Sequence, residues 1–201
     1  MIIVGYGRPF TNPYLELEWY IVDWGYRVLF ISIFFLNRTL RQYVFSACLC
    51  WPTLSAARDT ILGAFLVLGI DYGLRHLLFW IGMADGVYGT APTIYDPAWV
   101  HGFDLTIGLV LVAVAEELIY RVGFVRECEK RKVPVGAIYF IGTIVFAFAH
   151  WGSGLFPVIF AGAFAPVFIW LFRQHGSIWP ITIIHYIYNF LIFSGVINIL
   201  Y

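Results

Sequence analysis

Two neighbouring glutamates, Glu116 and Glu117, lie inside an apolar stretch of the chain, AVAEELIYR at residues 113–121. Between residues 103 and 115 only one aspartate and one threonine are polar. An ionisable side chain in hydrocarbon costs a few kcal/mol at least, and such residues usually mark a functional site. The pair therefore predicts acid–base chemistry in an apolar environment.

The two glutamates are not equivalent, because Arg121 follows Glu117 by four residues. At this spacing an acid and a base share one face of a helix and can pair. Glu116 points about 100° away around the helix and needs another partner. We therefore expect Glu117 to be held ionised in a salt bridge. Glu116 is expected to be desolvated and free to exchange a proton, as a general base must.

Few other polar side chains occur in the apolar C-terminal half. His150 ends the segment FAFAH, with Phe146 one turn before it, and His185 and Asn189 lie four apart in HYIYN. Residues four apart lie on one helix face. Together with Glu116, the two histidines and the asparagine predict a catalytic cluster. The alternative is that each is a hydrogen-bonding residue between membrane helices.

The composition indicates the elements that must position these residues. The chain has 201 residues, 61% hydrophobic, 20% aromatic and 12% charged, whereas soluble domains are nearer one quarter charged. We predict an all-α, polytopic transmembrane helical bundle. The formal net charge is zero, so nothing points to nucleic acid. Three cysteines, Cys48, Cys50 and Cys128, form no CxxC motif and indicate neither a disulfide framework nor a metal knuckle.

Six apolar stretches have about the 20 residues that a helix needs to cross a bilayer. They are Trp19–Leu36, Ile61–Gly82, Phe103–Phe124, Val133–His150, Leu155–Phe172 and Ile178–Tyr201. Pro166 should kink the fifth, which neighbouring helices can tolerate. The apolar run Tyr43–Leu54 is too short to span and is interpreted as interfacial or re-entrant.

We find no internal repeat or disordered linker, so residues 1–201 are expected to form one membrane domain. Residues 1–102 would supply N-terminal helices without an assigned role, and residues 103–201 the catalytic helices.

The basic residues follow alternate spans, which predicts the orientation in the membrane. They occur after the first, third and fifth spans: Arg38, Arg41, Arg58, Arg126, Lys130, Arg131, Lys132 and Arg173. The positive-inside rule places these loops in the cytoplasm and both chain ends outside. No cleavable signal peptide is recognisable, so the first helix should direct insertion. We expect an integral, multi-pass protein of the cell (inner) membrane if the source is prokaryotic.

Two further acid–base pairs have the spacing of Glu117 and Arg121. They are Asp23 with Arg27 and Asp71 with Arg75. Neutralising a charge within one helix is the cheapest way to carry it into a membrane. Both pairs are therefore expected to be structural.

Three motifs in order, Glu116-Glu117-x-x-x-Arg121, Phe146-x-x-x-His150 and His185-x-x-x-Asn189, resemble those of the CPBP intramembrane proteases. This family includes the CAAX-processing endoproteases and the bacterial Abi proteins. The resemblance covers about residues 113–190. It implies peptide hydrolysis in which Glu116 takes a proton from a water that is also bound by His150.

The resemblance also implies the other roles. His185 and Asn189 would stabilise the developing oxyanion, while Glu117, Arg121 and Phe146 would support the site. No cofactor or metal is expected. The substrate would be a membrane-anchored or lipid-modified protein or peptide, for example one that is prenylated or carries a C-terminal sorting helix.

Two alternative functions remain open. A metal-dependent membrane protease could use the two histidines and a glutamate as zinc ligands, although the sequence has no HExxH helix. A non-enzymatic bacteriocin-immunity or scaffold protein could retain the motifs as contacts between helices.

Overall fold

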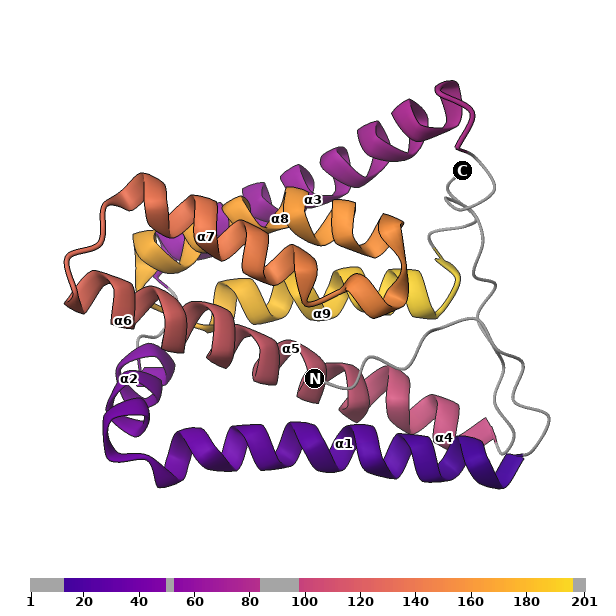
Figure 1. The fold of residues 1–201 in the computed structure, drawn as a ribbon, viewed down its shortest axis with the longest axis horizontal. Coiled ribbons are helices and arrows are strands. Elements are labelled where there is room, and N and C mark those ends of the chain that lie inside the picture. The colour runs from indigo at the N-terminus through magenta and orange to yellow at the C-terminus, as the bar shows by residue number, and fades with distance from the viewer. Residues whose placement is uncertain (1–12, 50–52, 84–97, 197–201) are drawn as a thin grey trace.

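The computed structural model describes residues 13–49, 53–83 and 98–196, and in this part the chain forms helices and connecting turns without any strand. The predicted all-helical fold is therefore confirmed. Long helices run back and forth along one axis of the molecule (Figure 1). The elements are α1 (Pro13–Leu36), α2 (Arg38–Leu49), α3 (Leu54–Trp80), α4 (Ala98–Phe103), η2 (Asp104–Gly108), α5 (Leu109–Glu117), η3 (Leu118–Gly123), α6 (Phe124–Lys130), α7 (Val135–Phe148), η4 (Trp151–Ser153), α8 (Leu155–His175) and α9 (Trp179–Phe193).

Some predictions fall on residues outside the described part. They concern the N-terminal residues 1–12, Cys50, residues 84–97 between the second and third predicted spans, and the end of the last predicted span over residues 197–201.

Among the residues that the structure describes, each predicted span contains helix. In the described part of the chain, α3 and α8 are long and apolar enough to cross a membrane. Helices α7 and α9 are apolar but shorter, with 14 and 15 residues. The third predicted span is divided by the π-helical turns η2 and η3 into shorter pieces. The count of six spans therefore stays a prediction.

The short helix α2 begins earlier than the apolar run at Tyr43 predicts. The side-chain oxygen of Asn37 accepts hydrogen bonds from the backbone N–H groups of Thr39 and Leu40, at 3.0 and 3.1 Å. An asparagine at this position satisfies N–H groups that have no partner within the helix. The helix therefore starts at Arg38, where hydrophobicity alone gives no signal.

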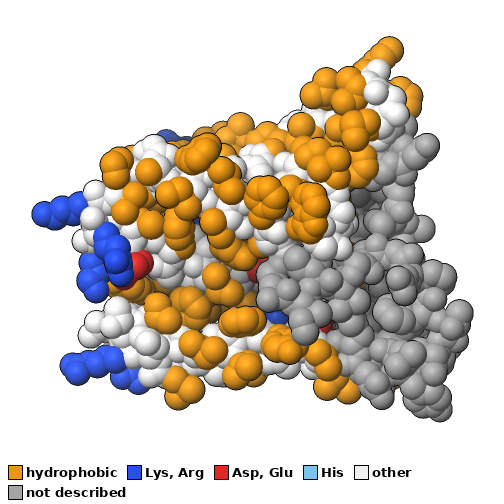
Figure 2. Space-filling model, in the orientation of Figure 1, with side chains coloured by type: hydrophobic (Ala, Val, Ile, Leu, Met, Phe, Trp, Pro, Cys, Tyr) orange, Lys and Arg blue, Asp and Glu red, His pale blue; other side chains and the backbone are white. Residues whose placement is uncertain are grey.

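Apolar side chains cover the flank of the molecule, while lysines and arginines gather at the end where α1 meets α2 and α6 meets α7 (Figure 2). Leu36, Phe65, Trp80 and Phe140 are each at least 68% exposed. Exposed apolar surface of this extent needs lipid or protein to cover it. Apolar helices of this kind fit a membrane protein.

Helix α8 forms the centre of the core through a ladder of buried phenylalanines. They recur at every fourth position and so share one helix face: Phe160, Phe164, Phe168 and Phe172. Three of the rings lie under arginines from other elements. The distances from guanidinium carbon to ring centroid are 5.2 Å for Arg75–Phe160, 5.1 Å for Arg121–Phe168 and 5.0 Å for Arg126–Phe172. A desolvated cation–π contact contributes about 2 kcal/mol, so this helix both fills the core and anchors charges.

Two glycines fix how helices approach α8 and how it ends. A Cβ at Gly63 of α3 would lie 2.8 Å from a methyl carbon of Leu171 and 3.0 Å from one of Ile184. Small residues permit such close helix packing in membrane bundles. Gly176 has φ +62° and its N–H donates to the Phe172 carbonyl at 2.7 Å, the left-handed conformation that ends many helices. The chain can then turn directly into α9.

Candidate active site

Glu116 and Glu117 are the last residues of α5, immediately before the π-helical turn η3. The Glu117 side chain is fully buried, whereas that of Glu116 is 18% exposed. Single π turns within α-helices often occur at functional sites. Here the turn carries Arg121, the predicted partner of Glu117.

Glu117 is held from two sides. Its Oε2 lies 3.2 Å from Nε of Arg121, and its Oε1 lies 2.8 Å from Nδ1 of His185 on α9. The Arg121 guanidinium also lies 4.1 Å from the centroid of the Phe146 ring and 5.1 Å from that of Phe168. The structure thus contains the predicted Glu117–Arg121 pair, and it adds a contact with His185 that the sequence did not indicate.

Glu116 faces both histidines without a direct hydrogen bond to either. Its Oε2 lies 3.9 Å from Nε2 of His150 and 3.8 Å from Nε2 of His185. These distances exceed those of a hydrogen bond. Among the described residues this buried oxygen has no hydrogen-bond partner. The structure therefore brings three of the four predicted catalytic residues together, from α5, the end of α7 and α9.

The contacts of the two Nδ1 atoms decide where the imidazole protons lie. Nδ1 of His150 lies 2.9 Å from the carbonyl oxygen of Phe146, which can only accept. Nδ1 of His150 therefore carries the proton, and the lone pair of Nε2 is directed toward Glu116. Nδ1 of His185 contacts Oε1 of Glu117, and with a proton on this nitrogen Nε2 carries a second proton only when the ring is an imidazolium.

The other two predicted site residues, Asn189 and Phe146, do not contact Glu116 in the same way as the histidines. Asn189 lies one turn after His185 on α9, half-buried, and its amide makes no hydrogen bond within the part of the chain that the structure describes. Phe146 is buried, and its ring centroid lies 4.9 Å from that of His150. Because it also contacts Arg121, Phe146 connects the buried salt bridge to the histidine that faces Glu116.

Arg27 of α1 is a charged neighbour of the site that the sequence did not indicate. Its Nη1 lies 3.9 Å from Oε1 of Glu116. The spacing to Asp23 revealed the intrahelical pair, but it gave no information about the helix against which α1 packs. In the structure α1 packs on α5, which places this arginine beside the glutamate.

The described residues contain no group of three histidine, cysteine or acidic side chains arranged to hold a metal ion. The expectation that the protein needs no metal or cofactor stays a prediction.

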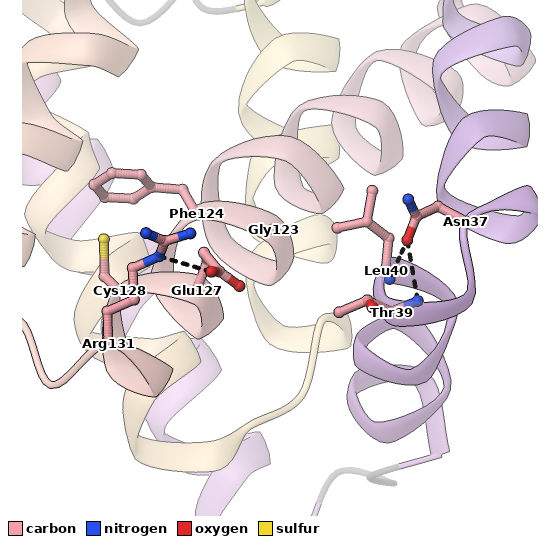
Figure 3. A pocket seen from close by; sticks show the side chains of 8 residues that line it. All are labelled: Asn37, Thr39, Leu40, Gly123, Phe124, Glu127, Cys128 and Arg131. Atoms are coloured by element: carbon pink, nitrogen blue, oxygen red, sulfur yellow. Dashed lines mark hydrogen bonds and ion pairs between the residues drawn. The ribbon is translucent and has the colours of Figure 1, made fainter.

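A groove of about 570 Å³ lies elsewhere, between the start of α2 and the end of η3 with α6 (Figure 3). Its lining residues are Asn37, Thr39, Leu40, Gly123, Phe124, Glu127, Cys128 and Arg131. A hydrogen bond from Arg131 holds the pKa of Glu127 below its usual value. None of the predicted site residues lines this groove, so it is separate from the candidate active site.

These observations define a class: a helical protein with an apolar flank that holds a carboxylate and two histidines within its bundle. The family model described as type II CAAX prenyl endopeptidase Rce1-like matches residues 97–191, the segment that contains all three motifs. Residues 97–191 thus match an Rce1-like domain of the CPBP family, and the predicted resemblance is confirmed for that segment. Proteins of this family are membrane-embedded proteases. Comparison with curated proteins and with solved structures gives no match.

Proposed function

We propose that this protein is an intramembrane endopeptidase that uses Glu116 as a general base to hydrolyse a peptide bond of a membrane-anchored or lipid-modified protein. One observation carries the proposal. Of the two glutamates, Glu117 is engaged by Arg121 and His185, while Glu116 directs a buried oxygen toward both histidines without a direct hydrogen bond. Only Glu116 is therefore available to take a proton.

The nucleophile would be a water bound by Glu116 and by Nε2 of His150. The lone pair of Nε2 accepts one hydrogen bond, which orients the water, and Glu116 accepts the other. Glu116 removes a proton as the water oxygen bonds to the scissile carbonyl carbon. The same proton then passes to the amine as the carbon–nitrogen bond breaks. Such general base catalysis contributes about 10² to 10⁴ in rate.

The oxyanion that forms needs hydrogen-bond donors, and His185 and Asn189 are the proposed ones. His185 can donate through Nε2 as an imidazolium, which the Glu117 carboxylate stabilises from the opposite side of the ring at 2.8 Å. Asn189 would supply its amide from the next turn of α9. Loss of one such donor typically costs about 10² to 10³ in rate.

We place the protein across the membrane with its basic end in the cytoplasm and six crossings. The gathering of lysines and arginines at one end and the apolar flank support this orientation (Figure 2). The whole chain would form one membrane domain, in the cell (inner) membrane of a prokaryote. Substrate backbone would be cleaved where its helix is unwound, because helical amides are hydrogen-bonded and shielded.

A prenylated protein is the first substrate to examine, because the matching family is described as prenyl endopeptidases. The purified protein in lipid vesicles should cleave either a farnesylated peptide ending in Cys-a-a-X or an unprenylated peptide anchored by a transmembrane helix. Replacing Glu116 by Gln, which preserves volume, should reduce kcat by about 10² or more. The control Arg131→Gln, at an exposed residue away from the site, should retain activity.

Two outcomes would overturn this mechanism. If the folded Glu116→Gln variant still performs the cellular role, the protein acts without hydrolysis, as a scaffold or immunity protein would. If the purified protein contains stoichiometric zinc and loses activity on chelation, a metal-activated water replaces the glutamate base.

A further inference from the structure

Arg27 lies on α1, outside the segment that the family model matches, yet its guanidinium faces the proposed base. Two of its three nitrogens are occupied by Asp23. Nε and Nη2 donate to the two carboxylate oxygens of Asp23, each at 2.8 Å. The third nitrogen, Nη1, lies 3.9 Å from Oε1 of Glu116. The bidentate pair thus fixes the orientation in which the arginine meets the glutamate.

The two oxygens of Glu116 consequently have different surroundings. Oε1 faces Arg27, while Oε2 faces Nε2 of His150 and Nε2 of His185. A cation on the Oε1 side leaves Oε2 free to accept a proton from a water. The arginine therefore lies where it can act on the charge of Glu116 without contacting the reacting atoms.

We propose that Arg27 is a positioning residue that keeps Glu116 ionised and oriented for proton transfer, so that α1 completes the active site of the Rce1-like segment. The inference rests on the proposed function, because it concerns the base of that reaction. A general base acts only when unprotonated. An opposite charge within about 4–6 Å favours the ionised form of a carboxyl group by about 1–3 pH units.

The other charges around Glu116 determine the size of this effect. Asp23 partly neutralises Arg27, and Arg121 is engaged by Glu117. The titratable groups that also face Glu116 are His150, His185 and Tyr120. Asp104 of η2 interacts with the Asp23–Arg27 pair and accepts a hydrogen bond from Trp24. Because Asp23 offsets part of the positive charge, we expect the effect of Arg27 to lie near the lower end of the range, at about one pH unit.

The test is the pH dependence of kcat/KM for cleavage of the farnesylated peptide in lipid vesicles. The acid limb is the low-pH side of this profile, where kcat/KM falls as the base becomes protonated. In Arg27→Gln the acid limb should move to higher pH by about one unit, which lowers the rate about tenfold on that limb. Arg27→Lys, which keeps the charge, should restore most of the rate. In Asp23→Asn the arginine loses the negative charge of Asp23, so the acid limb should move to lower pH.

The opposite behaviour of Arg27→Gln and Asp23→Asn separates an electrostatic role from a structural one. Both substitutions break the same intrahelical pair, so a purely structural pair predicts the same loss of folded protein and no shift of the acid limb. That result would overturn the inference. Arg131→Gln is the matched control, because Arg131 also follows a paired acid by four residues but lies away from the site.

The inference and the proposed function can fail independently. If the wild type cleaves the peptide and Glu116→Gln does not, while Arg27→Gln keeps the wild-type pH profile, only the role of Arg27 is wrong. If the wild type cleaves neither peptide, or Glu116→Gln is as active as the wild type, the proposed function itself is wrong. If Arg27→Gln does not fold, Asp23→Asn and Arg27→Lys still report whether the acid limb follows the charge.

Discussion

The pairs Asp23–Arg27 on α1 and Asp71–Arg75 on α3 have the same residue types at the same spacing, and the structure gives them different surroundings. Both arginines bond to their own aspartate through Nε at 2.8 Å. Asp71 is fully buried and also accepts a hydrogen bond from Tyr188 of α9 at 2.7 Å. The α1 pair is about one fifth exposed on its arginine side and faces Glu116.

A local acid–base spacing therefore predicts that a pair forms but not what the pair does. The α3 pair links α3 to the core helix α8, because Arg75 also lies over the ring of Phe160 on α8. The α1 pair leaves one guanidinium nitrogen directed at the proposed base. We therefore expect changes to the α3 pair to alter stability and changes to the α1 pair to alter the pH dependence of activity.

Of the changes to the two intrahelical pairs, Arg75→Gln should have the largest effect on stability. It leaves the buried Asp71 without its cation, and breaking one partner of a buried pair typically costs about 3–5 kcal/mol. The free energy of unfolding in detergent measures the loss. If this variant is as stable as the wild type but shifts the acid limb of activity, the assignment of the two pairs is reversed.

A second, smaller effect on stability should show how tightly α3 and α1 pack against their neighbours. Gly63→Leu on α3 would force a side chain against Leu171 and Ile184, and overpacking typically costs about 1–3 kcal/mol. Gly25→Leu on α1 is the control, because a Cβ there meets nothing within 4 Å. Thermal unfolding of both variants provides the comparison. Equal destabilisation of the two would show that α1 is as closely packed as α3.

The intrahelical acid–base pairs could be predicted from the sequence, because such pairs depend only on spacing within one helix. The Glu117–Arg121 pair and the location of helices in the apolar stretches follow from local periodicity. The start of α9 was also predicted closely. The helix begins at Trp179, one residue after the predicted start at Ile178, and Pro180 lies in its first turn, where proline is favoured.

The contacts between helices could not be predicted from the sequence. His185 meets Glu117 across 68 positions, and Arg27 meets Glu116 only because α1 packs on α5. Hydrophobicity identifies an apolar helix but does not specify its neighbour in a bundle whose helices expose many large apolar side chains. The π turn after Glu117, with the sequence LIYRVG, also has no evident signal that distinguishes it from an α-helical turn.

The smallest effect on stability should come from breaking the exposed pair Glu127–Arg131. This pair has the same four-residue spacing and an Nε–Oε1 distance of 2.7 Å. Exposed pairs contribute little to stability. Arg131 nevertheless holds the pKa of Glu127 below its usual value through a hydrogen bond. In Arg131→Gln this pKa should rise toward the usual value while thermal stability changes little.

The sign of this effect gives the relevant pH range. A lowered folded-state pKa contributes stability above the pKa of the unfolded chain, and that contribution disappears as the pH falls through the folded-state value. NMR titration of the Glu127 carboxyl would measure it. An unchanged pKa in the variant would mean that groups other than Arg131 cause the shift.

The different roles of the two glutamates are tested most directly by comparing Glu116→Gln with Glu117→Gln, measuring both peptide cleavage per folded molecule and the free energy of unfolding. We expect Glu116→Gln to be as stable as the wild type and inactive. Glu117→Gln should lose about 3–5 kcal/mol of stability, because Arg121 is then left buried without its anionic partner. A fully stable but inactive Glu117→Gln variant would contradict the division of roles, and wild-type cleavage by Glu116→Gln would contradict the mechanism.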